Sequence, residues 1–101
     1  YVKYAENSFL AMRVTFFNDL YNLMQKVHPQ LDYDNTVYAL GIDSRIGHSH
    51  NQVPGPDGRY GWGGHCLPKD TAAFVNFAER NKAKLPLIES IRDINITHRS
   101  K

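Results

Sequence analysis

The sequence predicts an all-α domain, and three observations lead to that fold class. Apolar residues recur at spacings of three and four through residues 1–27, which is the periodicity of one face of a helix. No segment shows the alternation of apolar and polar residues that is typical of a half-buried strand. All seven glycines lie between Gly41 and Gly64, so they interrupt the chain in one place. We therefore expect a small helical domain with one long N-terminal helix, a long glycine-rich loop and two or three shorter helices.

The first expected helix covers residues 1–27 and carries a single apolar stripe. No glycine or proline interrupts it before Pro29, and the residue before a proline is disfavoured in the α region, so the helix should end at His28. At 1.5 Å per residue it would be about 40 Å long, more than a small domain needs. Such a helix usually spans between domains or forms an interface. The stripe consists of Val2, Ala5, Phe9, Met12, Phe16, Leu20, Leu23 and Val27.

The second expected helix begins near Asp32 or Asp34, either of which can accept hydrogen bonds from the first N–H groups of a helix. From Asp43 to Cys66 the chain then reads as a long irregular loop. A loop of that length in a compact domain is usually functional or disordered, and its aromatic, basic and amide side chains favour a function. The apolar residues of the second helix are Val37, Tyr38, Leu40 and Ile42.

The last two expected helices each have a proline in the first turn. Pro68 should be the first residue of one, with Asp70 in its first turn, where the helix dipole favours an acid. Asn81 and Lys82 should end it, and Pro86 should lie in the first turn of the other. The residues expected on the inner sides are Ala72, Ala73, Phe74, Phe77 and Ala78, and then Leu87, Ile88, Ile91 and Ile94.

Composition and charge exclude several classes of protein. The chain has 101 residues, 42% of them hydrophobic and 22% charged, which is the composition of a single globular domain. Twelve Lys and Arg against ten Asp and Glu leave a net charge of +2, too small to predict a nucleic acid or a membrane surface as partner. No apolar run approaches the ~20 residues of a transmembrane helix.

One cysteine and few candidate ligands limit the covalent and metal chemistry. Cys66 is alone, which excludes an internal disulfide and a multi-cysteine zinc site and favours a reducing, cytoplasmic compartment. His48 and His50 are two apart but lack the further ligands that a metal site needs, so no metal is expected.

The segment GWGGHCLPKD at 61–70 concentrates the residues that could react. Cys66 stands just before an expected helix N-terminus, where the dipole, Lys69 or His65 would favour its thiolate. Asp70 follows one turn later and can face the same side as the sulfur. A thiol, a cation and a carboxylate together suit covalent catalysis followed by activation of water. Two alternatives remain open: Cys66 as a small buried hydrophobe, and Lys69 and Asp70 as solvated charges.

Two other pairs have both a functional and an ordinary interpretation. Lys3 and Asn7 lie one turn apart, away from the apolar stripe, and could polarise a carbonyl and donate to an oxyanion, or could be exposed helix residues. Arg45 suits bidentate recognition of a phosphate or sugar, and an ion pair with Asp43 is equally compatible with the spacing. Asn18 could be an amide that packs between helices.

Four segments in order resemble motifs of the UDP-glucose/GDP-mannose dehydrogenase family. Residues 61–70 resemble its active-site cysteine motif, and residues 3–11 (KYAENSFLA) resemble its central-helix motif with lysine and asparagine four apart. Asn18 stands where that helix carries a second asparagine, and residues 43–47 (DSRIG) resemble the loop that precedes the cysteine. The resemblance covers essentially the whole chain.

The resemblance implies that residues 1–101 form the single helical central domain of a larger enzyme, with a fold like the C-terminal domain of 6-phosphogluconate dehydrogenase. The family's N-terminal Rossmann domain, which binds NAD, and its C-terminal nucleotide-sugar domain are absent from this chain. No strand precedes the glycine series, so the chain is not expected to bind a dinucleotide by itself. In the family the central domain forms a homodimer through its long helix.

The implied reaction is oxidation of the C6 alcohol of a nucleotide sugar to a carboxylate with two NAD per sugar, and UDP-glucose is the expected substrate. By this resemblance Cys66 would form a thiohemiacetal and then a thioester. Lys3 and Asn7 would steady the C6 oxygen, and Asp70 would act as a base or orient water. The expected substrate contacts are Arg45, reaching the neighbouring subunit's substrate, with Asn51, Gln52, Tyr60, Gly63 and Gly64; the expected cofactor contacts are Gly63 and Lys69.

Three features depart from the family pattern. The loop at 48–60 is longer than is usual, Trp62 stands where phenylalanine or tyrosine is common, and His65 stands where small or aromatic residues are usual. Arg59 in the long loop is a further candidate for substrate contact. The alternative to an enzyme is a dimerisation or binding module that retains an idle motif, and the isolated chain is expected to be inactive in either case.

Overall fold

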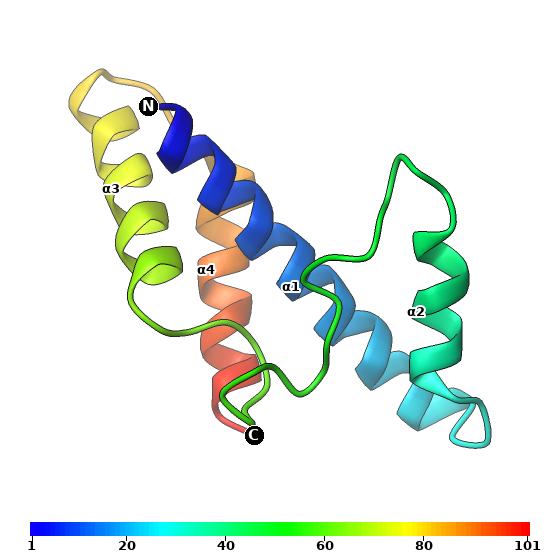
Figure 1. Cartoon of the computed structure of the whole chain (residues 1–101). Helices are drawn as coiled ribbons and strands as arrows, with labels where there is room; N and C mark the ends of the chain where they lie inside the picture. Colours follow the sequence, from blue (N-terminus) through cyan, green and yellow to red (C-terminus); the bar gives the residue numbers. More distant parts are fainter.

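A computed structural model describes the whole chain, Tyr1 to Lys101, and contains four helices and no strand (Figure 1). The helices are α1 (Val2–Val27), α2 (Tyr33–Gly41), α3 (Cys66–Arg80) and α4 (Pro86–Arg99). The prediction of an all-α domain with one long N-terminal helix, two or three shorter ones and a long glycine-rich loop is therefore confirmed, and the number of shorter helices is three. None of the four helices combines the length and the apolar composition that crossing a bilayer requires.

α1 is the axis of the molecule. α3 and α4 pack along its first half, and α2 lies beside its second half (Figure 1). The result is elongated, 47 × 31 × 22 Å. The loop between α2 and α3 crosses α1 and turns beside the end of α4, so it connects the two ends of the molecule. Each end has its own apolar cluster: Ala11, Trp62 and Ile91 in one, and Phe17, Met24, Tyr33, Val37 and Val53 in the other.

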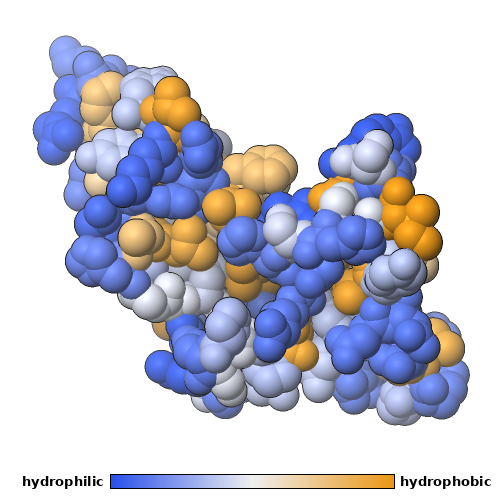
Figure 2. All heavy atoms as spheres, viewed as in Figure 1, coloured by the Kyte–Doolittle hydropathy of each residue, from blue (hydrophilic) through white to orange (hydrophobic).

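The apolar stripe of α1 lies mainly on the outside of the chain. Phe16 is 58% exposed and Leu23 is 59% exposed, and Val2, Phe9 and Val27 are also more than half exposed. The side of α1 that faces α3 and α4 is small and polar instead, since small side chains let neighbouring helices approach closely. Figure 2 shows apolar atoms gathered around the notch between the α3–α4 side and the α2 side. The buried residues of this side include Ser8, Ala11, Thr15 and Asn18.

The helix boundaries agree with the expectations except at the start of α3. α1 ends before His28, and Asp32 caps α2 by accepting the N–H of Asp34 at 2.9 Å. α3 begins at Cys66 and not at Pro68, so Asp70 lies in its second turn. Because the first N–H groups of a helix have no partner within it, a proline in the third position loses no hydrogen bond and the helix can start earlier.

The inner side of α4 was predicted incorrectly at two residues. Ile91 is 4% exposed as expected, but Leu87 is 58% and Ile94 is 36% exposed. The side that packs on the rest of the chain runs through Ile91, Asn95 and His98, at helical spacings of four and three. Leu87 and Ile94 are seven residues apart and lie beside this side of the helix. The polar residues Asn95 and His98 are buried in their place, which a prediction from apolar residues alone does not anticipate.

Candidate functional site

Two buried asparagines hold the glycine turn at 61–64 that leads into α3. Asn18 of α1 accepts the N–H of Gly61 at 2.9 Å. Asn95 of α4 accepts the N–H of Trp62 at 2.7 Å and donates to its carbonyl at 2.8 Å. The turn is therefore fixed to both α1 and α4 by side-chain amides, which answers the question left open about Asn18: it packs between elements and bonds the loop.

The two ends of this turn differ in the space around them. Gly61 has φ +74°, a left-handed conformation that favours glycine, and a Cβ there would collide with the amide of Asn95 and touch His98. Gly64 has φ +79°, and nothing lies within 4 Å of the position its Cβ would take. The glycine at 61 thus permits close packing inside the protein, whereas the one at 64 leaves its backbone approachable from outside.

Cys66 is the first residue of α3, and it is exposed. The interpretation of this cysteine as a small buried hydrophobe is therefore wrong. The unpaired N–H groups at a helix start carry partial positive charge, which stabilises an anion near them. A solvent-accessible sulfur at this position can meet a ligand without any rearrangement of the fold.

Asp70 lies one turn after Cys66 on the same helix and is 1% exposed. Asn7 of α1 donates a hydrogen bond to its Oδ2 at 2.5 Å, and Lys69 Nζ lies 3.4 Å from its Oδ1. The Asn7 bond, then Lys69 and the charge of Lys3, hold the pKa of Asp70 below its ordinary value, against the opposing effect of desolvation. Asp70 is thus an ionised, hydrogen-bonded carboxylate and not a solvated charge, and Asn7 is more than an exposed helix residue.

Asp70 should make the stability of the chain depend on pH in the acid range. Because its pKa is lowered in the folded state, its contribution is complete above the ordinary value of 3.8 and is lost as pH falls through the folded pKa. In Asp70→Asn, urea midpoints measured from pH 6 to pH 2.5 should therefore fall less steeply than in the wild type. Asp93→Asn, which removes an exposed carboxylate of α4, is the matched control and should leave the wild-type slope. Equal slopes in all three proteins would contradict the role of Asp70.

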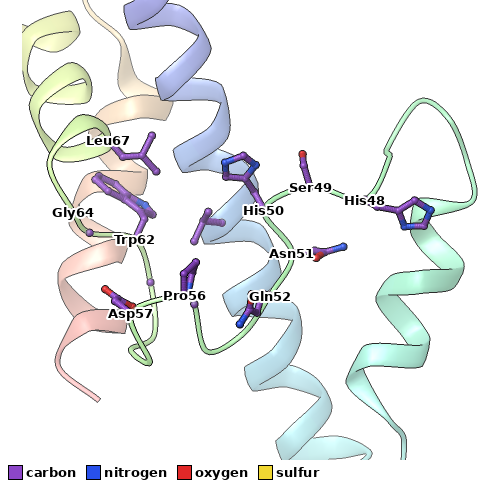
Figure 3. A pocket seen from close by; sticks show the side chains of 14 residues that line it. His48, Ser49, His50, Asn51, Gln52, Pro56, Asp57, Trp62, Gly64 and Leu67 are labelled. Atoms are coloured by element: carbon purple, nitrogen blue, oxygen red, sulfur yellow. The ribbon is translucent and has the colours of Figure 1, made fainter.

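A hollow of about 530 Å³ lies beside the turn (Figure 3). One wall is the arm of the loop that carries residues 48–52; Trp62, Gly64 and Leu67 form the other, with Asp57 below Trp62, and α1 lies between the two walls. The lining contains four of the residues expected to contact substrate or cofactor, namely Asn51, Gln52, Gly63 and Gly64.

Two side chains hold the arm in place. Arg13 of α1 donates to the carbonyls of Ile46 at 2.6 Å and Ser49 at 2.7 Å. The hydroxyl of Tyr33 donates to the carbonyl of Asn51 at 2.7 Å. Burial raises the pKa of Tyr33 well above its ordinary value, so the hydroxyl keeps its proton and remains a donor. The wall of the hollow that bears Asn51 is therefore tied to both α1 and α2.

Four expected contact residues lie outside the lining of the hollow. Arg59 is exposed, and its guanidinium donates to the carbonyl of Arg99 at 3.1 Å. Arg45 is exposed and forms an ion pair with Asp43 at 2.7 Å, the ordinary interpretation of that spacing. Tyr60 packs on Tyr21, with ring centroids 5.8 Å apart, at the edge of the apolar cluster around α2. Lys69 is half-exposed beside the buried Asp70.

Comparison with known proteins gives the chain a family. Residues 1–97 match the UDP-glucose/GDP-mannose dehydrogenase family, central domain. The chain belongs to this family. It is 37% identical over 94 residues to a UDP-glucose 6-dehydrogenase of Rhizobium meliloti, and 35% identical over 94 residues to UDP-glucose 6-dehydrogenase YwqF of Bacillus subtilis and to AglM of Haloferax volcanii. Each match covers 93% of this chain and about a fifth of the relative.

Two residues that organise the site of this dehydrogenase-family chain escaped sequence reasoning. Asn95 was not singled out at all. Arg99 donates from Nε to the carbonyl of Trp62 at 3.0 Å and forms an ion pair with Asp57 at 2.8 Å, which lowers the pKa of that carboxyl. Its guanidinium also occupies the position that a Cβ of Gly63 would need. Both residues lie on a helix with mixed polar and apolar positions, and no motif or spacing distinguishes them from solvated residues.

Proposed function

We propose that the chain is the central domain of a larger NAD-dependent nucleotide-sugar 6-dehydrogenase, which converts UDP-glucose to UDP-glucuronate. One observation carries the proposal. An exposed Cys66 begins α3 one turn before Asp70, and Asp70 bonds Asn7 of α1, so the segments 3–11 and 61–70 are in contact. The relatives named UDP-glucose 6-dehydrogenase support this substrate among the nucleotide sugars.

In the proposed reaction the C6 alcohol is first oxidised to an aldehyde, and the sulfur of Cys66 then attacks the aldehyde carbon. The new carbon–sulfur bond gives a thiohemiacetal, whose oxygen is protonated. Loss of a hydride and that proton gives a thioester. Water then adds to the thioester carbon, the carbon–sulfur bond breaks, and the acid and the free thiol are released. NAD, when bound, supplies the acceptor for each of the two hydrides.

The residues around Cys66 suit the charges that arise in these steps. Lys3 and the amide of Asn7 are donors for the C6 oxygen where negative charge develops. Asp70 is ionised at neutral pH. It can accept a proton from the water that attacks the thioester, or orient that water. Since Asn7 bonds Asp70 directly, a change at either residue should affect the same hydrolytic step.

The hollow beside the turn is the proposed place of the sugar. Asn51 and Gln52 offer amides from its arm, and the approachable backbone of Gly64 fits a ligand held close to the chain. We assign Tyr60 to the same substrate surface as a member of this loop. Gly63 and Lys69 are the proposed contacts of this chain with NAD. An exposed thiol must remain reduced to react, so we place this chemistry in the cytoplasm.

The proposal includes a second copy of the chain. The exposed stripe of α1 would bury large apolar side chains, Phe16 and Leu23 among them, in a homodimer along this helix. Arg45, which is exposed at the start of the loop, would then reach the neighbouring subunit's substrate. The Rossmann and nucleotide-sugar domains would belong to the same polypeptide, on either side of these residues.

The test is the amount of NADH released by the complete polypeptide that carries these residues. UDP-glucose, UDP-N-acetylglucosamine and GDP-mannose would each be supplied as the limiting substrate with excess NAD. Two NADH for each UDP-glucose consumed, with formation of the uronic acid, is the expected result. One NADH per sugar would contradict the double oxidation, and release only with another nucleotide sugar would contradict the substrate.

The exposed stripe also favours a different function, assembly without catalysis. In that case the complete polypeptide would release no NADH with any nucleotide sugar, yet sedimentation would give the mass of two copies. Ordinary thiol reactivity of Cys66 in that protein would agree with an idle motif. The two functions therefore give different results in the same preparation.

A further inference from the structure

We propose that Asn95 is a positioning residue, whose side-chain amide fixes the conformation of the turn at 61–64 and through it the place of Cys66. The inference rests on the proposed function for what Cys66 does. The contact between Asn95 and Trp62 is present whatever reaction Cys66 carries out. Asn95 touches neither the thiol nor the hollow, so its effect on the reaction would be transmitted by the backbone.

The first argument is the geometry of the contact. Asn95 is 8% exposed and Trp62 is 5% exposed. The amide oxygen accepts from the N–H of Trp62 at 2.7 Å, and the amide nitrogen donates to the carbonyl of the same residue at 2.8 Å. These two groups belong to the two peptide planes that flank the Cα of Trp62. One planar amide bonded to both therefore fixes the φ and ψ of that residue.

The second argument is the absence of any other hydrogen bond between this point and α3. The N–H and carbonyl groups of Gly63 and Gly64 take part in no hydrogen bond, and the next one along the chain is from the N–H of Lys69 to the carbonyl of His65. Glycine has the widest range of backbone conformations, so this stretch would move freely if its upstream end were released. Trp62 is thus the last fixed point before Cys66.

The third argument is that the surrounding residues support the same contact. Asn18 bonds Gly61, and the indole of Trp62 donates to Thr15 at 2.9 Å. Gly61 lacks the Cβ that would collide with the amide of Asn95. The two hydrogen bonds hold the turn to α1, and the missing Cβ of Gly61 lets the turn approach α4. Only Asn95 bonds both the N–H and the carbonyl of Trp62. Arg99 donates to the carbonyl alone.

The test compares variants of the complete polypeptide. Asn95→Leu removes both bonds and keeps a side chain of similar size. Asn95→Asp keeps the acceptor and loses the donor, so it remains informative if the leucine variant does not fold. Asn81→Leu is the matched control, because Asn81 is an exposed amide at the end of α3 that bonds only the carbonyl of Phe77. Amide hydrogen exchange of the peptide 60–67, alkylation of Cys66 by iodoacetamide, and kcat and KM are measured for each folded variant.

The expected result has a local and a catalytic part. Exchange of the peptide 60–67 should become at least about tenfold faster in Asn95→Leu, with α1 and the rest of α3 unchanged, since the buried N–H of Trp62 loses its acceptor. The alkylation rate of Cys66 should change, and kcat should fall about 10- to 100-fold with KM within about threefold of wild type, as for a misplaced reacting group. Asn95→Asp should lie between the leucine variant and wild type.

Three results would overturn the inference: exchange and alkylation that match wild type, a similar fall of kcat in Asn81→Leu, or faster exchange throughout the chain, which would indicate a general loss of stability. The outcome for the proposed function is separate. If wild type releases no NADH while the Asn95 variants change in exchange and alkylation, the proposed reaction fails and the positioning of the turn stands. If wild type is active and the Asn95 variants behave like it, the positioning fails alone.

Discussion

Cys66→Ser is expected to lower the kcat of the complete polypeptide by about 10³-fold or more and to stop formation of the uronic acid. A thiolate is a strong nucleophile and a good leaving group, whereas a serine hydroxyl stays protonated near neutral pH unless a base activates it. Because Cys66 is exposed and its side chain makes no hydrogen bond, the replacement should leave the fold intact. The loss would therefore report on the chemistry of the sulfur.

The measurement is NADH release together with the amount of acid formed from UDP-glucose. In Cys66→Ser, oxidation should stop before the acid, so that no more than one NADH per sugar appears. Asn76→Ser is the matched control, because Asn76 is an exposed residue on the same helix, and its kcat should stay within about twofold of wild type. A Cys66→Ser variant that forms the acid at the wild-type rate would exclude the thiohemiacetal and thioester route.

The helices could be predicted because their signals are local. The run without glycine or proline up to Val27, the cap at Asp32 and the proline at the start of α4 each act through neighbouring residues, and all three are present in the structure. The burial of the stripe along α1 is a different matter. Periodicity identifies an apolar side, but it does not say whether that side meets the same chain or another, and here most of it remains exposed.

Only part of the site could be predicted for the same reason. The positions of Cys66 and Asp70 follow from one turn of one helix, so their proximity is a local property. The bond from Asn7 to Asp70 joins residues 63 positions apart, and only the resemblance to the family connected them beforehand. Asn95 and Arg99 bond the backbone of Trp62. Every residue has a backbone carbonyl, so the sequence does not indicate which one a distant side chain will bond.

Gly61→Ala is expected to destabilise the chain by about 3 kcal/mol. The left-handed φ of +74° accounts for roughly 1 kcal/mol of this loss for a residue with a Cβ. The remainder, about 2 kcal/mol, comes from the collision with Asn95, which would have to withdraw and leave its two buried bonds to Trp62 broken. Urea unfolding of wild type and variant gives the difference in the free energy of unfolding.

Gly58→Ala separates these two contributions, because Gly58 has a similar φ of +77° and nothing within 4 Å of the position of its Cβ. It should cost only the backbone part, about 1 kcal/mol. The difference between the two variants therefore measures the contact of Gly61 with Asn95. If both variants lose the same free energy, Asn95 can move aside without cost, and the turn that precedes Cys66 would then be held by Asn18, Thr15 and Arg99. If Gly61→Ala loses more free energy than Gly58→Ala, the same substitution is then made in the Asn95→Leu variant. Disappearance of the extra loss in that variant would assign it to the amide of Asn95, since the two changes would remove the same contact.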